Sequence, residues 1–374
     1  MVDDASDFVH RVVMISNGCI LRKDYYTYCR IYSEYYVPVD NQAKLYLRRY
    51  YNEDGSTAYE ELIDGEMEMY KFQDRLMDST EELVEYMMSC LHFTDHDVVL
   101  LDGECGNIDR AAFLQNVYPA KTGFIIHTEH FLHRDEEHIL WCNWFEYAFS
   151  HPENVDFFVT NTEAQRCLIK EQFRKYKGLE VRVETIPVAY LDRIRAPQGS
   201  RKKHSLITAG RLMGDKNVNK IIEAVVMARK EVSDLTLDIY GGGVRQAELQ
   251  ELIKRLDCSA YVRLCGFRKL EEIYQQYEAY VSASFGETFG ITLLEAVGSG
   301  LPIVGFDLPY GMQVFVEDGK NGYRISRISS EGLAEGIVRL FTEANLESFR
   351  KYSYQKAESY LEIAIEKKWR EVLS

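Results

Sequence analysis

Two cations in the second half of the chain have the types and the spacing of groups that bind a phosphorylated ligand. Arg211 and Lys216 follow the apolar stretch 205–209, which predicts a buried strand, so both would lie just past the end of that strand. A guanidinium offers a forked pair of donors and an ammonium offers a point charge, and both suit a diphosphate. The competing interpretation is two surface cations beside a loop, but the order of the motifs that follow favours the diphosphate.

Two acids lie further along the chain, with a spacing that would bring them together. Glu287 and Glu295 are separated by about 2.2 turns of an α-helix, so both would face roughly the same side. In isolation, such a pair is usually one edge of a solvated helix. Here the following residues favour a site, because Gly298 and Gly300 end the predicted helix and Pro302 prevents its continuation.

The segment before this helix predicts an anion-binding loop. Residues 280–283 form a short apolar run like a buried parallel strand, and residues 301–306 form the next one, so the stretch predicts a βαβ unit. Ligands of α/β sheets bind at the carboxyl ends of strands, where this loop begins. Thr288 or Ser284 would cap the helix, and a diphosphate would meet its N-terminal amides. Those amides belong to Thr288, Phe289 and Gly290.

Composition narrows the class of protein. The net charge of −15, from 44 basic and 59 acidic residues, argues against nucleic acid as a partner, because phosphate contacts need an excess of Lys and Arg. The eight cysteines include no C-x-x-C pair and are expected to be reduced structural thiols. No apolar run approaches the roughly 18 residues of a membrane span, and the acidic N-terminus does not resemble a signal peptide. We therefore expect a cytoplasmic protein that could associate peripherally with the inner face of the cell membrane.

The first part of the chain differs from the rest. Residues 1–73 are rich in Tyr, Val and Ile, show partial alternation and predict an antiparallel β-meander. Its tyrosines could bind a polymer or a partner protein, or they could pack against one another across the strands. The expected turns fall at Asn17-Gly18, Asp40-Asn41, Asp54-Gly55 and Asp64-Gly65.

The pattern then changes to alternating strands and helices, which predicts parallel sheets. Residues 74–190 predict an N-terminal Rossmann-like domain with about four strands and a helix over 135–149. Residues 200–345 predict a second Rossmann-like domain, with a helix over 270–276. Residues 346–374 predict a closing helix that would leave the second domain and pack on the first.

These motifs resemble the signature of retaining glycosyltransferases with the GT-B fold, in which two Rossmann-like domains face a cleft. The E-x7-E spacing, the Gly-Pro run 298–304, the turn 318–323 and the pattern G-R-L-x-x-x-K over 210–216 match that family in order. The resemblance implies a family-4-like hexosyltransferase that takes its sugar from a nucleotide sugar, without a cofactor or a metal ion.

The resemblance also assigns roles to the charged residues. Arg211 and Lys216 would stabilise the negative charge that develops on the leaving diphosphate, which is the main electrostatic task of the reaction. Glu287 would contact the donor sugar. Glu295 would hold the ribose hydroxyls, because a carboxylate can accept from two vicinal hydroxyl groups.

Three further positions would border the donor. Gly241 begins a glycine run after a strand, which we interpret as a tight turn, and Phe267 lies in a turn that resembles the family's base-binding turn. His130 best matches the histidine that the family places near the donor sugar, where its ring or its carbonyl would act; a structural histidine is the alternative. The pair His127-x-x-His130 lacks the helical H-E-x-x-H spacing of a zinc site.

Over essentially the whole chain, the closest resemblance is to the A subunits of accessory-Sec UDP-N-acetylglucosamine–peptide glycosyltransferases of Gram-positive bacteria. The phrases at 16–36, 48–61 and 205–212 carry this match. It implies transfer of N-acetylglucosamine from its UDP form to Ser and Thr of a serine-rich protein, with a B subunit as partner through the meander. The chain is also similar to wall-teichoic-acid α-glycosyltransferases, so a glycopolymer acceptor is the alternative.

The sequence departs from this family at its start. The family begins with a strand and a Gly-rich loop before the meander, whereas this sequence begins almost at the meander. We therefore expect an N-terminally truncated first Rossmann-like domain with an exposed sheet edge. Loss of that loop would weaken the positioning of phosphate and acceptor, so a non-catalytic binding subunit is the second hypothesis.

Overall fold

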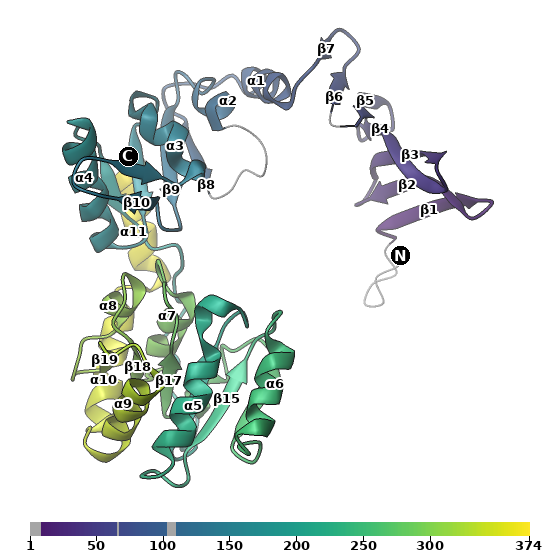
Figure 1. Ribbon diagram of the computed structural model, residues 1–374. Helices are drawn as coiled ribbons and strands as arrows, with labels where there is room; N and C mark the ends of the chain where they lie inside the picture. Colours follow the sequence, from purple (N-terminus) through teal and green to yellow (C-terminus); the bar gives the residue numbers. More distant parts are fainter. Residues whose placement is uncertain (1–8, 66, 103–109) are drawn as a thin grey trace. The chain divides into compact units, whose positions relative to one another are not determined.

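The computed structural model describes residues 9–65, 67–102 and 110–374 (Figure 1). They divide into two units. The first contains the described residues of 9–99, 110–122 and 146–155, and the second contains those of 100–102, 123–145 and 156–374. Among the helices of these residues, none combines the length and the apolar character needed to cross a membrane. The seven cysteines in the described ranges form no disulfide.

The first unit begins with a seven-stranded sheet in which each strand neighbours the next along the chain. All of its pairs are antiparallel, so the predicted meander is confirmed. Asn17, Asp40 and Asn41 have positive φ, as tight hairpin turns require. The strands are β1 (Arg11–Ser16), β2 (Cys19–Tyr26), β3 (Arg30–Val39), β4 (Gln42–Tyr51), β5 (Thr57–Asp64), β6 (Met67–Lys71) and β7 (Leu76–Met77).

One face of this sheet carries a ladder of stacked aromatic rings. Tyr25, Tyr32, Tyr50 and Tyr59 lie opposite one another on β2 to β5, with ring centroids 4.3 to 5.4 Å apart. Phe72 continues the ladder, 4.9 Å from Tyr59. For these tyrosines, cross-strand packing is therefore the correct interpretation.

A ladder of alternating charges runs beside the rings on the same face. Lys23, Glu34, Arg48 and Glu61 occupy opposing positions on the same four strands. Arg48 lies 3.4 Å from the Glu34 carboxylate and 2.7 Å from that of Glu61. Glu34 and Glu61 are only 8% and 4% exposed, so both need cationic partners. Arg48 serves both carboxylates, and Lys23 Nζ lies 3.8 Å from that of Glu34.

Two helices follow the sheet in the first unit. Helix α1 (Thr80–Cys90) begins with two side-chain hydrogen bonds: the N-cap Ser79 Oγ accepts from the Glu82 amide at 3.2 Å, and the Glu82 carboxylate accepts from the Asp78 amide at 3.0 Å. Helix α2 (Arg110–Leu114) packs against α1. Their shared core consists of Val84, Met88, Ala112 and Val117.

A four-stranded sheet has the order β13-β12-β9-β8. Strand β12 (Phe157–Thr160) pairs in parallel with β9 (Lys121–Ile126) and with β13 (Val183–Thr185), and α4 (Glu163–Lys177) connects β12 to β13. Strand β8 (Val98–Asp102) is at the edge, where Leu100 is 36% exposed.

The prediction of a helix over 135–149 is wrong for the first half of that stretch. A hairpin of β10 (Phe131–Arg134) and β11 (Ile139–Trp141) occupies that stretch, and α3 (Asn143–Ser150) begins only afterwards. The Asp135 carboxylate accepts from the amides of Glu137 and His138 at 2.8 and 2.7 Å. Such local bonds give the backbone a turn as an alternative to a helix.

The second Rossmann-like domain contains a six-stranded parallel sheet in the order β16-β15-β14-β17-β18-β19. The helix expected over 270–276 is a single 3₁₀ turn, η3 (Tyr274–Gln276). The strands are β14 (Ser205–Ala209), β15 (Thr236–Tyr240), β16 (Val262–Gly266), β17 (Ala279–Ser282), β18 (Ile303–Phe306) and β19 (Gly322–Ile325). The helices are α5 (Val218–Ala228), α6 (Gln246–Arg255), α7 (Ile291–Gly298), α8 (Gly311–Phe315) and α9 (Ser330–Thr342).

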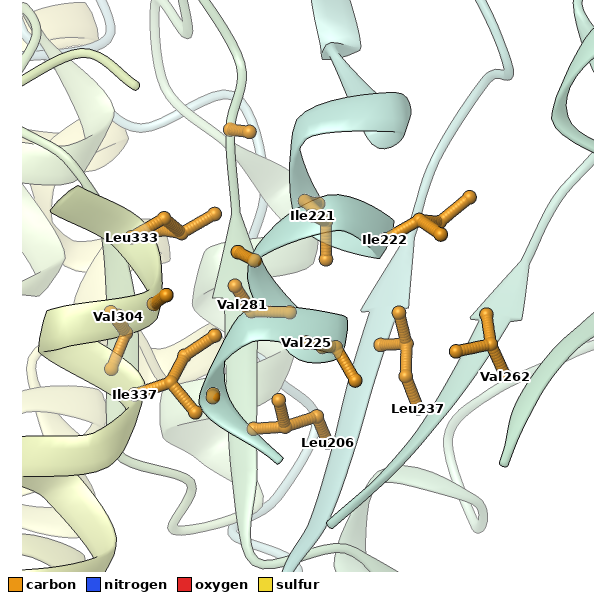
Figure 2. Close-up of a cluster of buried hydrophobic side chains, with 14 of the residues drawn as sticks. Leu206, Ile221, Ile222, Val225, Leu237, Val262, Val281, Val304, Leu333 and Ile337 are labelled. Atoms are coloured by element: carbon orange, nitrogen blue, oxygen red, sulfur yellow. The ribbon is translucent and has the colours of Figure 1, made fainter. Parts of the chain in front are cut away.

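Helices α5 and α9 cover one face of this sheet with aliphatic side chains (Figure 2). Ile221 and Val225 of α5 belong to the same buried cluster as Leu206 of β14 and Val281 of β17. This core fixes the strands whose ends carry the predicted site, because a close-packed interior allows little movement.

The closing segment consists of two helices, α10 (Leu346–Glu358) and α11 (Glu362–Leu373), rather than one. The chain breaks between them because Leu191 pairs with this stretch: its amide donates to Tyr360 O at 2.8 Å, and its carbonyl accepts from the Glu362 amide at 3.0 Å. Helix α11 then reaches the four-stranded sheet, where Lys368 Nζ donates to Thr185 O at 3.5 Å.

Candidate active site

The candidate site lies where the strand order of the six-stranded sheet reverses, between β14 and β17. Arg211 and Lys216 follow β14, and Glu287 follows β17. Lys216 Nζ lies 2.6 Å from Glu287 Oε1, although 71 residues separate them. The predicted cation and the predicted acid therefore meet at the switch point, where open α/β sheets bind their ligands.

Two adjoining cavities, of about 480 and 370 Å³, form one groove at this point. They are continuous because Gly210, Arg211 and Thr292 line both. Every site residue predicted from the sequence, apart from His130, lines one of them. The first is lined by Lys216, Glu287, Thr288, Phe289 and Gly290, and the second by Gly241, Phe267 and Glu295.

His130 does not lie in the groove. Its ring is fully buried, and its Nε2 is 2.6 Å from Gln172 Oε1. His127, the first residue after β9, lines the groove instead and pairs with Asp102. Because the carboxyl ends of parallel strands face the ligand, the residue directly after the strand is the exposed one. In the described part of the chain, no three His, Cys, Asp or Glu side chains gather in a metal-binding cluster.

Helix α7 begins later than expected. Its first residue is Ile291 and its N-cap is Gly290, so neither Thr288 nor Ser284 caps it. Gly290 has a φ of 88°, and a Cβ there would lie 2.8 Å from Leu293 Cδ1, so this position suits glycine. Because α7 begins only at Ile291, Glu287 lies in the loop before the helix.

Glu295 projects from α7 into the second cavity. Burial raises the pKa of its carboxyl, and the phenol of Tyr274, which donates to it at 2.9 Å, opposes that increase. Tyr274 is itself fully buried in η3. A carboxylate fixed in this way still has acceptor positions for hydroxyl groups of a ligand.

Gly241 forms part of the wall of the second cavity, and its backbone lies in close contact with that of Gly210. A Cβ on Gly241 would lie 1.8 Å from Gly210 O, and its φ of 132° disfavours other residues. Phe267 lies at the rim and is 87% exposed, so its ring has a free face. An aromatic face of this kind can stack on a planar base.

Two residues in the site were missed by the sequence reasoning. Asn161 follows β12, lines the first cavity beside His127 and is only 3% exposed. The sequence could have indicated Asn161 as a site residue, because it directly follows a strand of the first parallel sheet. Tyr274 had no such signal, because its contact with Glu295 depends on how η3 packs against α7.

Two α/β domains, a switch point that pairs a cation with an acid, and a closing helix that returns to the first parallel sheet are the features of GT-B glycosyltransferases. The family described as "Glycosyl transferases group 1" matches residues 192–358, and that described as "GtfA extended beta-sheet domain" matches residues 1–74.

Relatives identify the family within this class. The UDP-N-acetylglucosamine–peptide N-acetylglucosaminyltransferase GtfA subunit of Streptococcus gordonii is 42% identical over 98% of this chain and 74% of its own length. The crystal structure of the pneumococcal O-GlcNAc transferase GtfA in complex with UDP and GlcNAc has a TM-score of 0.93 and 39% identity, covering 100% of this chain and 75% of that one. TarM, with a TM-score of 0.82, 21% identity and coverage of 97% and 73%, shares the fold. The chain belongs to the GtfA family of glycosyltransferases.

Proposed function

We propose that this chain transfers N-acetylglucosamine from UDP-N-acetylglucosamine to Ser and Thr hydroxyls of a serine-rich protein, with retention of configuration and without a metal ion. The observation that carries the proposal is the groove itself: Lys216 and Glu287 meet in one cavity, and Glu295 lines the adjoining one. The relative from Streptococcus gordonii is named for transfer of this sugar from this donor to peptide.

Each group in the groove has a role that suits its chemistry. Arg211 and Lys216 neutralise the charge that develops on the leaving UDP, which is the group of the donor that most needs stabilisation in the transition state. Glu287 contacts the sugar next to Lys216. Glu295 accepts hydrogen bonds from the ribose hydroxyls, and Phe267 stacks on the base. A metal-independent route needs these cations, because nothing else then offsets the diphosphate charge.

A partner glycosyltransferase subunit is part of the proposal. A chain in the crystal structure of a GtfA/B complex resembles this one with a TM-score of 0.89 and 41% identity, covering 98% of this chain and 75% of that one. The outer strand β1 of the meander offers a surface for such a partner, because it is at the end of the sheet and several of its large apolar side chains are exposed. These are Val12, Val13, Met14 and Ile15.

Transfer assays test the proposal directly. We would measure transfer from UDP-N-acetylglucosamine and from UDP-glucose to a serine-rich peptide, with and without EDTA and with and without a B subunit. Nuclear magnetic resonance of the product gives the anomeric configuration. The proposal predicts an α-linked N-acetylglucosaminyl-peptide in EDTA and its loss in Glu287→Gln. Preferred transfer to poly(ribitol phosphate) would instead support a teichoic-acid acceptor, and binding of partner without any transfer would support a non-catalytic subunit.

A further inference from the structure

The segment before α8 is attached to the loop that carries Glu287. The Tyr310 and Gly311 amides both donate to the Glu287 carbonyl, at 2.9 and 2.7 Å. A Cβ on Gly311 would lie 2.0 Å from Phe289 O, so the two backbones are in close contact. Tyr310 thus fixes the main chain of Glu287 from outside the loop.

The side chain of Tyr310 makes a second, separate contact. Its phenol donates to the Glu129 carboxylate, 2.9 Å from Oε1 and 3.2 Å from Oε2, across 181 residues of sequence. Glu129 lies between His127, which lines the groove, and the buried His130. Its Oε1 also accepts from the His130 amide at 3.4 Å. The loop after β9 and the loop after β17 are therefore joined through one residue.

The protonation states suit this contact. Burial alone would raise the pKa of Glu129, but hydrogen bonds from His130 and Tyr310 outweigh it and lower the pKa below its usual value. Burial and the nearby Glu129 charge raise the pKa of Tyr310. At neutral pH the phenol is therefore a donor and the carboxylate is charged, which gives a charge-assisted hydrogen bond.

We infer that Tyr310 is a positioning residue for sugar transfer, which holds the Glu287 loop in register with the His127 loop. Neither its phenol nor the Glu129 carboxylate lines the cavity that would hold UDP. The contact therefore acts on the alignment of reacting groups rather than on the nucleotide. Small misplacements in an active site reduce the rate by large factors. The inference rests on the proposed function.

Tyr310→Phe tests the inference with little disturbance, because it removes only the hydroxyl. Tyr360→Phe is the matched control. Tyr360 packs on Phe289 and Phe315 close to the same loop, with ring centroids 6.0 and 5.1 Å away, and among the described residues its phenol makes no hydrogen bond to another side chain. We expect kcat for N-acetylglucosamine transfer to fall about tenfold or more in Tyr310→Phe. The KM for the donor and the Kd for UDP should change less than twofold, and Tyr360→Phe should match the parent.

A double-variant comparison locates the effect in the Tyr310–Glu129 pair. Glu129→Ala should reduce kcat by a similar factor, and the double variant Tyr310→Phe/Glu129→Ala should be no slower than either single one. Glu129→Gln keeps an acceptor and should recover part of the rate. An unchanged kcat in Tyr310→Phe, an equal loss of UDP affinity, or multiplied losses in the double variant would each overturn the inference.

Hydrogen–deuterium exchange gives a readout that does not need turnover. In Tyr310→Phe, peptides covering 127–131 and 284–292 should both exchange faster, whereas Tyr360→Phe should leave them unchanged. Faster exchange in only one of the two segments would contradict the inference. If the parent protein shows no transfer yet both segments respond, the proposed function fails while the coupling of the two loops stands.

Discussion

Lys216 and Glu287 form an ion pair in the groove, with Nζ and Oε1 2.6 Å apart and with side chains 18% and 23% exposed. Water screens this pair only in part, so the attraction is stronger than at an open surface. Both residues lie in loops whose strands share the switch point of the sheet. Lys216 Nζ also lies 3.5 Å from Asp215 Oδ2, and a bound diphosphate would add a further anion beside it.

Replacing Lys216 by Ala should reduce kcat/KM for sugar transfer by about 10²–10³-fold, the usual loss on removal of one group that stabilises transition-state charge. The assay is transfer from UDP-N-acetylglucosamine at saturating acceptor. Lys230→Ala, at an exposed position beyond α5, serves as the control and should have the parent's rate. A Lys216→Ala rate within threefold of the parent would remove Lys216 from the site.

Tyr274→Phe should change how UDP binding depends on pH. Burial raises the pKa of Glu295 and the Tyr274 hydrogen bond opposes it, so removal of the phenol raises this pKa further. If the charged carboxylate accepts from the ribose hydroxyls, as we propose, the loss of UDP affinity on acidification should begin at a higher pH. A calorimetric series of Kd values, measured as the pH is lowered stepwise for both proteins, would show this displacement.

The control for that experiment is Tyr277→Phe. Tyr277 is one residue beyond η3 and also buried, but its phenol donates to Asp238 and lies 3.0 Å from the Tyr240 phenol, so it has a different carboxylate partner from Tyr274. The pH profile of UDP binding should match that of the parent. If UDP affinity were lost at the same higher pH in both variants, the two phenols would act on the stability of the fold and not on the pKa of Glu295.

Gly241→Ala should unfold or distort the wall of the second cavity. The new Cβ would meet Gly210 O at 1.8 Å in a backbone conformation that disfavours side chains, so we expect a loss of about 2 kcal/mol or more and no UDP binding. Thermal unfolding and calorimetry measure both. A Cβ on Gly242 would have no atom within 4 Å, so Gly242→Ala should keep the parent's stability although Gly242 also lines the second cavity; an equal loss of stability in the two variants would contradict the close-approach argument.

Arg48→Ala should destabilise the meander much more than Lys44→Ala. Loss of Arg48 leaves the nearly buried Glu34 and Glu61 without their shared cation, which we estimate at about 2 kcal/mol given its partial exposure. Lys44 pairs at 3.6 Å with Asp64, whose side chain is 86% exposed, and such pairs contribute about 0–1 kcal/mol. Hydrogen exchange of β3 to β5 compares the two variants. Similar protection in Arg48→Ala and Lys44→Ala would contradict a stabilising role for the charge ladder.

The meander should also lose stability in acid. Burial alone would raise the pKa of Glu34, but hydrogen bonds from Tyr36 and Tyr25 and the nearby Lys23 outweigh it, so the pKa lies below its ordinary value of 4.5. A lowered pKa contributes stability that is complete above pH 4.5 and lost as the pH falls through the folded-state value. Hydrogen-exchange protection of β3, measured from pH 6 downward, should fall with this loss of stability. In Glu34→Gln, which has no carboxyl to titrate at this position, the protection should depend less on pH.

Much of the fold was accessible from the sequence. Strand β14 agrees with its expected bounds, because apolar period and turn residues are encoded within a few neighbouring positions. The hairpin over 131–141 was not accessible in this way. Its aromatic residues fit a helical pattern as well as a strand, and the Asp135 turn that decides between them depends on one side chain.

The sequence by itself determined which residues follow each strand, and therefore that Arg211, Lys216 and Glu287 would gather at one end of a parallel sheet. The tertiary structure decided which of two histidines faces the groove, and that Tyr274 and Tyr310 support the acids from outside their loops. The reason is physical. Periodicity and turn preferences act over a few residues, whereas hydrogen bonds between residues 21 and 181 positions apart exist only once the elements have packed.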